Sequence, residues 1–398
     1  MTSIHPHVPK RSTIPTLAAL TLLLLLVSTI VGNAAPAPYE LTSKQLSDFR
    51  RDGVIVVRGM LSGERLQNAV AAAHTIQRKQ SWGQRLVYKL FPSYRNLEFQ
   101  TYRKHAAFKT VAFDSTAPTI CAKLMGLDDE ENGQQGDTTT SKPRSLRLLK
   151  EAVLGFSRGD TGCGWHVDDK TFWPSEDSHE DNNKLVDKHK RSQHQRRREA
   201  GINVWITLSP VTAKEGGGLA VALGSHNLTG KGRAGKVLQK ARRAIASKGA
   251  QTQCILDKIE PSCHNYMERN KRVYDLQPGD AIIHDRYVFH RADAFHEGLD
   301  DDDKAETEDV TKQRISLRYM PSDATFFNTG HRVDAVAQRK QLQTGDPLWK
   351  AGEYFPQVWP SQLAAEAQAS PQRDTNPFGG KVLVKIAKIM LTPKPKAK

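Results

Sequence analysis

Short apolar stretches separated by turns and polar segments are the feature that most constrains the fold of this chain. These stretches have the length of single strands, and the first of them is rich in β-branched residues. They cover residues 54–57, 145–156, 202–208, 219–223, 281–284, 288–290 and 315–319. A capping-box pattern at Thr42 and Gln45 predicts a short helix that ends at Gly53, and a second helix begins near Ser62. We therefore expect a mainly β core with flanking helices, an α+β fold.

A His-x-Asp pair follows the second of these stretches, and a third candidate metal ligand, His290, lies far downstream. His166 and Asp168 are one residue apart, and in an extended strand such side chains lie on the same face. Two imidazoles and one carboxylate form the facial triad of non-haem Fe(II) oxygenases, which leaves coordination positions open for a cosubstrate and O2. Because a chain with 14 histidines contains His-x-Asp by chance, the motif needs support from its context.

That context is an ordered series of further motifs around the pair. They are Phe49-Arg50-Arg51-Asp52-Gly53, Val54-Ile55-Val56-Val57-Arg58-Gly59, Asn203-Val204-Trp205, Gly216-Gly217-Gly218, Gly224-Ser225-His226 and Pro278-Gly279-Asp280. With these motifs the sequence resembles the phytanoyl-CoA dioxygenase family of Fe(II)/2-oxoglutarate oxygenases, from about residue 41 to about residue 321. The resemblance implies a double-stranded β-helix, which is a jelly-roll or cupin-like barrel.

The resemblance also implies the site residues and the cofactors. It implies that His166, Asp168 and His290 are catalytic and bind the metal. The expected cofactor is Fe(II), and the expected cosubstrates are 2-oxoglutarate and O2, with ascorbate as a further candidate. His284 and His296 also follow the Gly279-Asp280 turn, but His290 is where the family has its distal ligand. His284 is expected to be a buried barrel residue, and His226 in Gly-Ser-His is expected to be structural.

The distal carboxylate of 2-oxoglutarate requires a cation, for which the planar guanidinium of arginine is well suited. Arg314 occupies the strand where the family places this arginine. Lys312 and Arg318 lie on the same strand face, so they remain alternatives. Trp205 matches a family tryptophan near the cosubstrate, and it could equally be an aromatic residue of the barrel core.

The sequence departs from the family pattern beside two of these motifs. Arg291-Ala292-Asp293 follows His290 where a Gly-Ser pair is common, and Leu223 replaces a proline before Gly-Ser-His. A fixed cation at Arg291 would recruit an anionic substrate or restrict the pocket. The alternative is that Arg291 points outward and pairs with Asp293 or with the acidic run at residues 300–303.

The expected activity is hydroxylation of an unidentified organic substrate, small or lipid-like, with release of succinate and CO2. The alternative is a catalytically silent barrel that acts as a binding module of the secretory pathway. A third alternative, a halogenase, is disfavoured by Asp168, because related halogenases replace the carboxylate ligand with a small residue. The sequence does not indicate an oligomeric state.

The first 35 residues have the pattern of a signal peptide or signal anchor. Lys10 and Arg11 precede an apolar stretch within residues 14–31, and small residues up to Ala34 provide a cleavage site. The pattern predicts the secretory pathway, either the ER or Golgi lumen or the extracellular space, with possible membrane anchoring. A glycosylation sequon at residues 227–229 and a candidate disulfide between Cys254 and Cys263 are compatible with this placement.

The formal net charge of +15 would suit a nucleic acid or an anionic membrane surface. Much of the excess is confined to residues 184–198, residues 231–243 and the C-terminal tail, without interleaved aromatic residues. Nucleic-acid binding is therefore not expected. The C-terminal segment remains a candidate for membrane contact, because Lys381, Lys385 and Lys388 recur on one helical face.

These patterns predict one catalytic domain with extensions at both ends. The signal segment covers residues 1–35, the dioxygenase domain residues 36–345, and a C-terminal extension with a basic tail residues 346–398. Two insertions interrupt the domain, a charged one at residues 175–200 and an acidic one at residues 297–312.

Overall fold

A computed structural model gives the structure of the chain. The structure describes residues 39–80, 82, 97–128, 145–160, 164–167, 201–226, 256–296, 311–324, 326, 342–343 and 345–360. The signal segment, Asp168, the charged insertion and the basic tail lie outside the described residues, as do the sequon and Cys254. The chain divides into two units, residues 1–39 and residues 40–398, and the fold described below belongs to the second.

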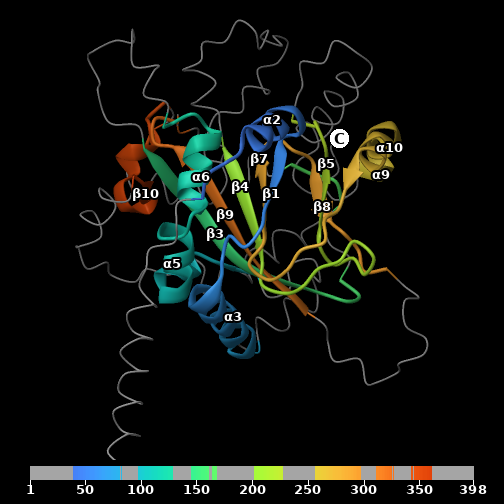
Figure 1. Cartoon of the computed structure of the whole chain (residues 1–398), viewed down its shortest axis with the longest axis horizontal. Helices are drawn as coiled ribbons and strands as arrows, with labels where there is room; N and C mark the ends of the chain where they lie inside the picture. Colours follow the sequence, from blue (N-terminus) through green and yellow to red (C-terminus); the bar gives the residue numbers. More distant parts are fainter. Residues whose placement is uncertain are drawn as a thin grey trace, which may run out of the picture. The chain divides into compact units, whose positions relative to one another are not determined.

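The larger sheet is antiparallel and runs in the order β1-β7-β4-β9-β3-β10, with β2 also paired to β3 (Figure 1). Its strands are β1 (Val54–Val57), β2 (Glu98–Phe99), β3 (Leu146–Ser157), β4 (Ile202–Thr207), β7 (Ala281–Asp285), β9 (Thr311–Pro321) and β10 (Gln357–Trp359). Strands distant in sequence are neighbours, so the sheet is held together by contacts between remote parts of the chain.

The smaller sheet has the order β6-β5-β8, from β6 (Lys271–Arg272), β5 (Leu219–Ala222) and β8 (His290–Ala292). His166 forms an isolated antiparallel bridge with His290, so the chain at His166 lies beside β8. Alternation along β5 places Leu219 and Val221 in a hydrophobic cluster with Trp205 and Ile282 of the larger sheet. The two sheets therefore face each other across a shared core.

This arrangement is a mixed α+β fold with a curled antiparallel sheet of the double-stranded β-helix type, as the sequence predicted. All of the predicted strands are present, with shifted ends for some. β9 begins at Thr311 rather than at Ile315, and β8 begins at His290 rather than at Val288. The sheet also continues past residue 345, the predicted end of the domain, because β10 pairs with β3.

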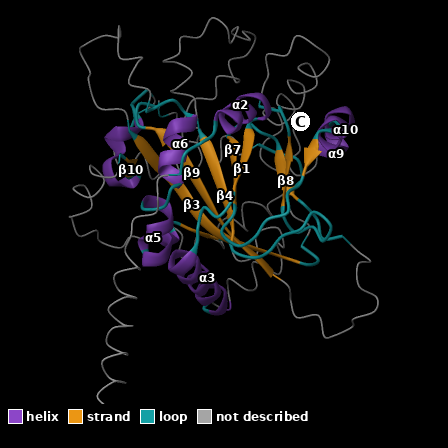
Figure 2. Cartoon of the chain, in the orientation of Figure 1, coloured by secondary structure: helices purple, strands orange, loops and turns teal. Residues whose placement is uncertain are grey.

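Helices cover the outer faces of both sheets, as Figure 2 shows. On the larger sheet, the Tyr319 hydroxyl of β9 donates a 2.8 Å hydrogen bond to the Ala112 carbonyl of α5. On the smaller sheet, Cys263 and Met267 of α10 pack against Ala220 and Ala222 of β5. The helices are α2 (Ser43–Asp52), α3 (Gly63–Arg78), η2 (Thr101–Arg103), α5 (Ala106–Phe113), α6 (Ala117–Leu124), α9 (Leu256–Ile259), α10 (Pro261–Arg269) and η7 (Leu348–Tyr354). In the described residues, no helix has the length and apolar character needed to cross a membrane.

The predicted capping box of α2 is present. The Gln45 backbone N–H donates to the Thr42 hydroxyl at 3.1 Å, and the Thr42 backbone N–H donates to the Gln45 side-chain oxygen at 3.0 Å. The helix ends at Gly53, which has a left-handed φ of 74°.

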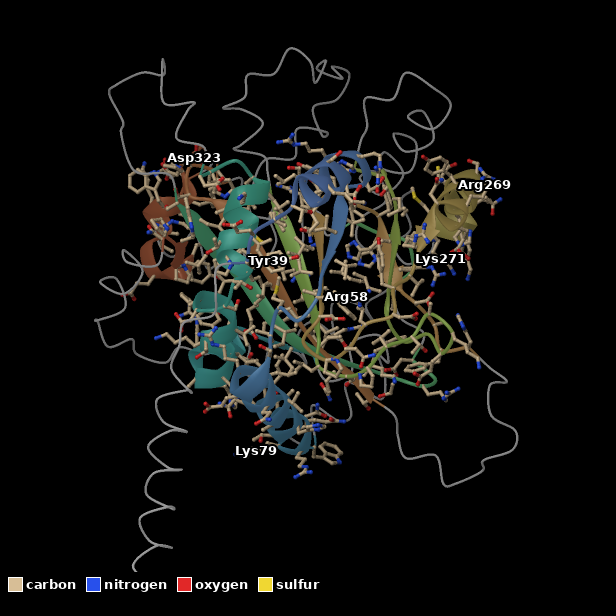
Figure 3. The ribbon with its side chains drawn as sticks, in the orientation of Figure 1. Tyr39, Arg58, Lys79, Arg269, Lys271 and Asp323 are labelled. Atoms are coloured by element: carbon tan, nitrogen blue, oxygen red, sulfur yellow. The ribbon has the colours of Figure 1, made fainter. Side chains whose placement is uncertain are left out.

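The Pro-Gly-Asp motif links the N-terminal segment to the barrel. The Asp280 carboxylate accepts hydrogen bonds from the Gly59 N–H at 2.8 Å and from the guanidinium of Arg58, which Figure 3 labels, at 2.7 Å. Gly279 has a φ of 91°, and a Cβ there would lie 2.0 Å from the Leu61 carbonyl oxygen. The motif is therefore required by packing and by backbone geometry.

The Gly-Ser-His motif is also structural, as the sequence predicted for His226. The Ser225 hydroxyl accepts a hydrogen bond from the Phe289 N–H at 2.8 Å, which fixes the residue before His290. The His226 ring lies 3.3 Å from the Arg50 carbonyl oxygen, at the C-terminal end of α2.

A buried carboxyl group gives the fold a predicted pH dependence. Glu151 on β3 is fully buried, and it accepts hydrogen bonds from the Thr101 hydroxyl and the Tyr102 N–H. Burial raises the pKa of Glu151 from 4.5 to about 7, despite the opposing effect of these hydrogen bonds. Between these values the folded protein keeps a proton that the unfolded chain has lost, so the free energy of unfolding falls as the pH rises.

We expect this loss to be about 3 kcal/mol between pH 4.5 and pH 8, at 1.36 kcal/mol for each pKa unit. Glu151→Gln can keep both hydrogen bonds without a charge, so its free energy of unfolding should lack this component. Urea unfolding of both proteins at pH 5 and pH 8 measures the difference. Parallel pH profiles for the two proteins would show that Glu151 is not the group responsible.

Candidate active site

The backbone pairing of residue 166 with β8 brings His166 and His290 together. Their backbones exchange both antiparallel hydrogen bonds, at 3.0 and 2.9 Å, and their ring centroids are 4.4 Å apart. The Nδ1 atom of His166 lies 2.8 Å from the Gly164 carbonyl oxygen, and the Nδ1 atom of His290 lies 3.0 Å from the Val288 carbonyl oxygen. Because a carbonyl can only accept, both Nδ1 atoms carry the proton, and Nε2 is then the nitrogen with a lone pair for a metal.

His284 lies close to this pair. It is buried, as predicted, and its ring centroid is 4.7 Å from that of His290. Its Nδ1 donates to the Asp285 carbonyl at 2.9 Å. Within the described ranges, no group of three or more His, Cys, Asp or Glu side chains is arranged to hold a metal. The predicted third ligand, Asp168, lies outside those ranges, and so does the neighbouring Asp169.

Arg314 is a buried cation inside the barrel. Its guanidinium lies 5.3 Å from the ring centroid of Phe156 and 5.5 Å from that of Trp205. In the described part of the chain, its Nε and Nη1 atoms have no hydrogen-bond partner. Burial lowers the pKa of Arg314 to about 10, and Asp160 opposes this shift. The group is therefore still charged at neutral pH, and a buried guanidinium with two unsatisfied donors would suit the binding of an anion.

The other predicted cations of β9 have different surroundings. Lys312 forms a 3.0 Å ion pair with Glu215, which already satisfies its charge. Arg318 lies further along the same face, opposite Asn203 of β4. All three of these β9 cations are buried. The difference in partners favours Arg314 over Lys312 as the binding group for a carboxylate.

The cross-strand register shows a polar row that the sequence analysis missed. Lys150 is opposite Arg318, Arg318 is opposite Asn203, and Asn203 is opposite His284. All of these side chains are buried, and His284 contacts His290. Register between strands far apart in the sequence creates this row, so no local motif could have identified it.

The pocket role predicted for Arg291 is wrong, and its pairing with Asp293 is correct. β8 alternates, so His290 points into the barrel and Arg291 points out. Arg291 contacts Asp293 at 3.4 Å, and its Nε donates to Glu268 of α10 at 3.1 Å. Its guanidinium also lies 5.2 Å from the ring centroid of Trp165. Glu268 was not identified from the sequence.

The described residues fit the cofactors that the sequence suggested. The Nδ1 contacts of the two histidines assign Nε2 as the nitrogen that could bind a metal, and Arg314 is a buried guanidinium with unsatisfied donors among the described residues. The position of the carboxylate ligand is not among the described residues.

Comparison with known proteins identifies the family. Residues 49–296, more than half of the chain, match the family described as phytanoyl-CoA dioxygenase (PhyH). The chain belongs to the phytanoyl-CoA dioxygenase family. The matched region contains both histidines, Asp168 and Trp205, and Arg314 lies beyond it. No curated protein matches the chain at a significant level.

Several solved structures are similar to this PhyH-family chain. One is the non-heme alpha-ketoglutarate-dependent carbocyclase SnoK from nogalamycin biosynthesis, with a TM-score of 0.51 and 19% identity, covering 82% of this chain and 100% of SnoK. The non-heme alpha-ketoglutarate-dependent epimerase SnoN of the same biosynthesis has a TM-score of 0.48 and 17% identity. The match covers 84% of this chain and 98% of SnoN. EctD from S. alaskensis, solved with 2-oxoglutarate and 5-hydroxyectoine, has a TM-score of 0.44 and 14% identity. The match covers 74% of this chain and 80% of EctD. At these identities, SnoK supports the fold alone.

Proposed function

We propose that this chain is an Fe(II)- and 2-oxoglutarate-dependent hydroxylase acting on a small organic or lipid-like substrate. The observation that carries the proposal is Arg314, a buried guanidinium without a hydrogen-bond partner for Nε and Nη1 in the described part of the chain. It lies on the inner face of the larger sheet, where β7 also places His284 against His290. A dicarboxylate bound to a metal at one end would find a cation at its other end.

His166, Asp168 and His290 would hold the iron, and Arg314 would hold the distal carboxylate of 2-oxoglutarate. When bound, iron would supply the oxidative chemistry that consumes O2 and converts 2-oxoglutarate to succinate and CO2. The protein's own contribution is orientation. Gly164 and Val288 fix the tautomers of the two imidazoles through their carbonyl oxygens, at 2.8 and 3.0 Å.

The surroundings of Arg314 would exclude water from the cosubstrate. Phe156 and Trp205 flank the guanidinium, so a carboxylate bound there exchanges its hydration for a charged hydrogen bond in an apolar environment. Trp205 can thus serve both as a core aromatic residue and as a cosubstrate contact.

The test is production of succinate from 2-oxoglutarate by purified, iron-loaded protein under O2. We expect slow conversion without a substrate and faster conversion when an extract contains the substrate. An untargeted comparison of metabolites before and after the reaction identifies which compound gains an oxygen atom. Products with no added oxygen would instead favour a cyclisation or an epimerisation, the reactions named for SnoK and SnoN.

The alternative is a catalytically silent barrel that acts as a binding module. A buried guanidinium whose Nε and Nη1 have no partner among the described residues is destabilising without a ligand, so a barrel without a ligand would be more stable without it. Absence of succinate under every condition, together with unchanged folding, would favour this alternative.

A further inference from the structure

We infer that Glu268 on α10 is a positioning residue that holds the two metal-binding histidines at their mutual distance. The inference rests on the proposed function, since it concerns the geometry of the same metal site.

Trp165 and Arg291 form the cross-strand pair adjacent to the pair of histidines. His166 is opposite His290 in an antiparallel bridge, so the residue before the first is opposite the residue after the second. Side chains alternate along strands, so Trp165 and Arg291 lie on the outer face, and they contact each other at 5.2 Å. Any change in the spacing of this outer pair moves the backbone of the inner pair.

One carboxylate connects both members of the outer pair. The Trp165 indole N–H donates to Glu268 Oε1 at 2.8 Å, and Arg291 Nε donates to the same oxygen at 3.1 Å. Arg291 Nη2 donates to Glu268 Oε2 at 3.4 Å, which makes the contact bidentate. Glu268 therefore holds both the indole and the guanidinium through hydrogen bonds.

Helix α10 is itself anchored to the smaller sheet, so Glu268 is held in place. Cys263 and Met267 are buried in a cluster with Trp165 and Phe289. Phe289 precedes His290, and its N–H donates to the Ser225 hydroxyl at 2.8 Å. The helix thus contacts the chain on both sides of the histidine pair, through an apolar cluster and through a charged contact.

The contacts of Arg291 connect the metal-binding strand to α10. Arg291 links β8 to α10 through Glu268, and it also contacts Asp293, which follows β8. Outer groups that orient metal ligands commonly change metal affinity 10- to 100-fold when they are removed. We expect an effect near the lower limit, because Glu268 acts on the histidines through their neighbours.

The test compares the metal affinity of the full-length protein with that of Glu268→Gln. Glutamine keeps the volume and the hydrogen bond from Trp165 but loses the charged contact with Arg291. Titration with Co(II), followed by calorimetry and by the visible spectrum of the bound metal, should show about tenfold weaker binding and a shifted spectrum. The melting temperature of the metal-free protein should change by no more than a few degrees.

Two further variants make the result specific. Arg269→Ala is the matched control, since Arg269 is an exposed residue of the same helix (Figure 3), and its metal affinity should equal that of the native protein. Arg291→Ala should weaken binding as Glu268→Gln does, and the double variant should be no weaker than either single variant. Additive losses would show that the two residues act separately, which would overturn the inference.

Equal metal affinity in the native protein and Glu268→Gln would also overturn it, even if stability falls, because Glu268 would then only stabilise the helix. Failure of the native protein to bind Co(II) would instead refute the proposed function on which the inference rests. The native titration therefore distinguishes the two failures.

Discussion

Replacing His290 by alanine is expected to abolish tight metal binding, with a loss of at least about 100-fold in Fe(II) affinity. Removal of an outer partner of a metal ligand already costs 10- to 100-fold, and removal of the ligand itself should cost more. His290 is buried and faces His166 at a ring-centroid distance of 4.4 Å. Anaerobic titration with Fe(II) and 2-oxoglutarate, followed by the visible charge-transfer band of the complex, measures the loss.

His284→Ala is the matched control for this experiment. His284 is a buried histidine whose ring contacts His290 at 4.7 Å, so both variants remove the same side chain from neighbouring positions. We expect the control to retain the band. Loss of the band in His284→Ala and its retention in His290→Ala would make His284 the distal ligand.

Arg314→Met is expected to raise the 2-oxoglutarate requirement by at least about 30-fold. Loss of one partner of a buried, hydrogen-bonded charge pair costs about 2 to 5 kcal/mol, and each 1.4 kcal/mol is a tenfold change. Without the cosubstrate the opposite trend should appear. Removal of a buried charge that has few partners is often neutral or stabilising, so the ligand-free variant should melt at the native temperature or above it.

Lys312→Met and Arg318→Met are the controls, because both cations lie on the same face of β9 and are equally buried. Lys312 should affect stability more than cosubstrate use, since it has an ion pair with Glu215 at 3.0 Å. Succinate formation across a range of 2-oxoglutarate concentrations separates the variants. Equal effects of all three substitutions would contradict the assignment of Arg314.

The assignments of His290 and Arg314 also predict that the metal and 2-oxoglutarate increase each other's affinity. If His290 and Arg314 hold opposite ends of one cosubstrate, 2-oxoglutarate should bind more tightly to the iron-loaded protein than to the metal-free protein. By linkage, the metal should then bind more tightly in the presence of 2-oxoglutarate by the same factor.

The sequence by itself determined the elements whose information is local. The capping box at Thr42 and Gln45 depends on residues three apart, and the strands depend on short apolar runs, so both could be predicted. The order of the motifs was sufficient to predict the family and the barrel, which the match over residues 49–296 confirms. The assignments of His166, Asp168, His290 and Arg314 to the iron and the cosubstrate remain predictions.

Only the tertiary structure decided which of several equivalent side chains have partners. Lys312 and Arg314 share one strand face in the sequence, but Glu215 pairs with the first and not with the second, and that contact crosses a distance of nearly one hundred residues. Alternation beside His290 places Arg291 on the outer face, and the packing of α10 then gives it Glu268 as a partner. The choice of Glu215 for Lys312 and of Glu268 for Arg291 depends on packing between segments remote along the chain, which local sequence patterns do not encode.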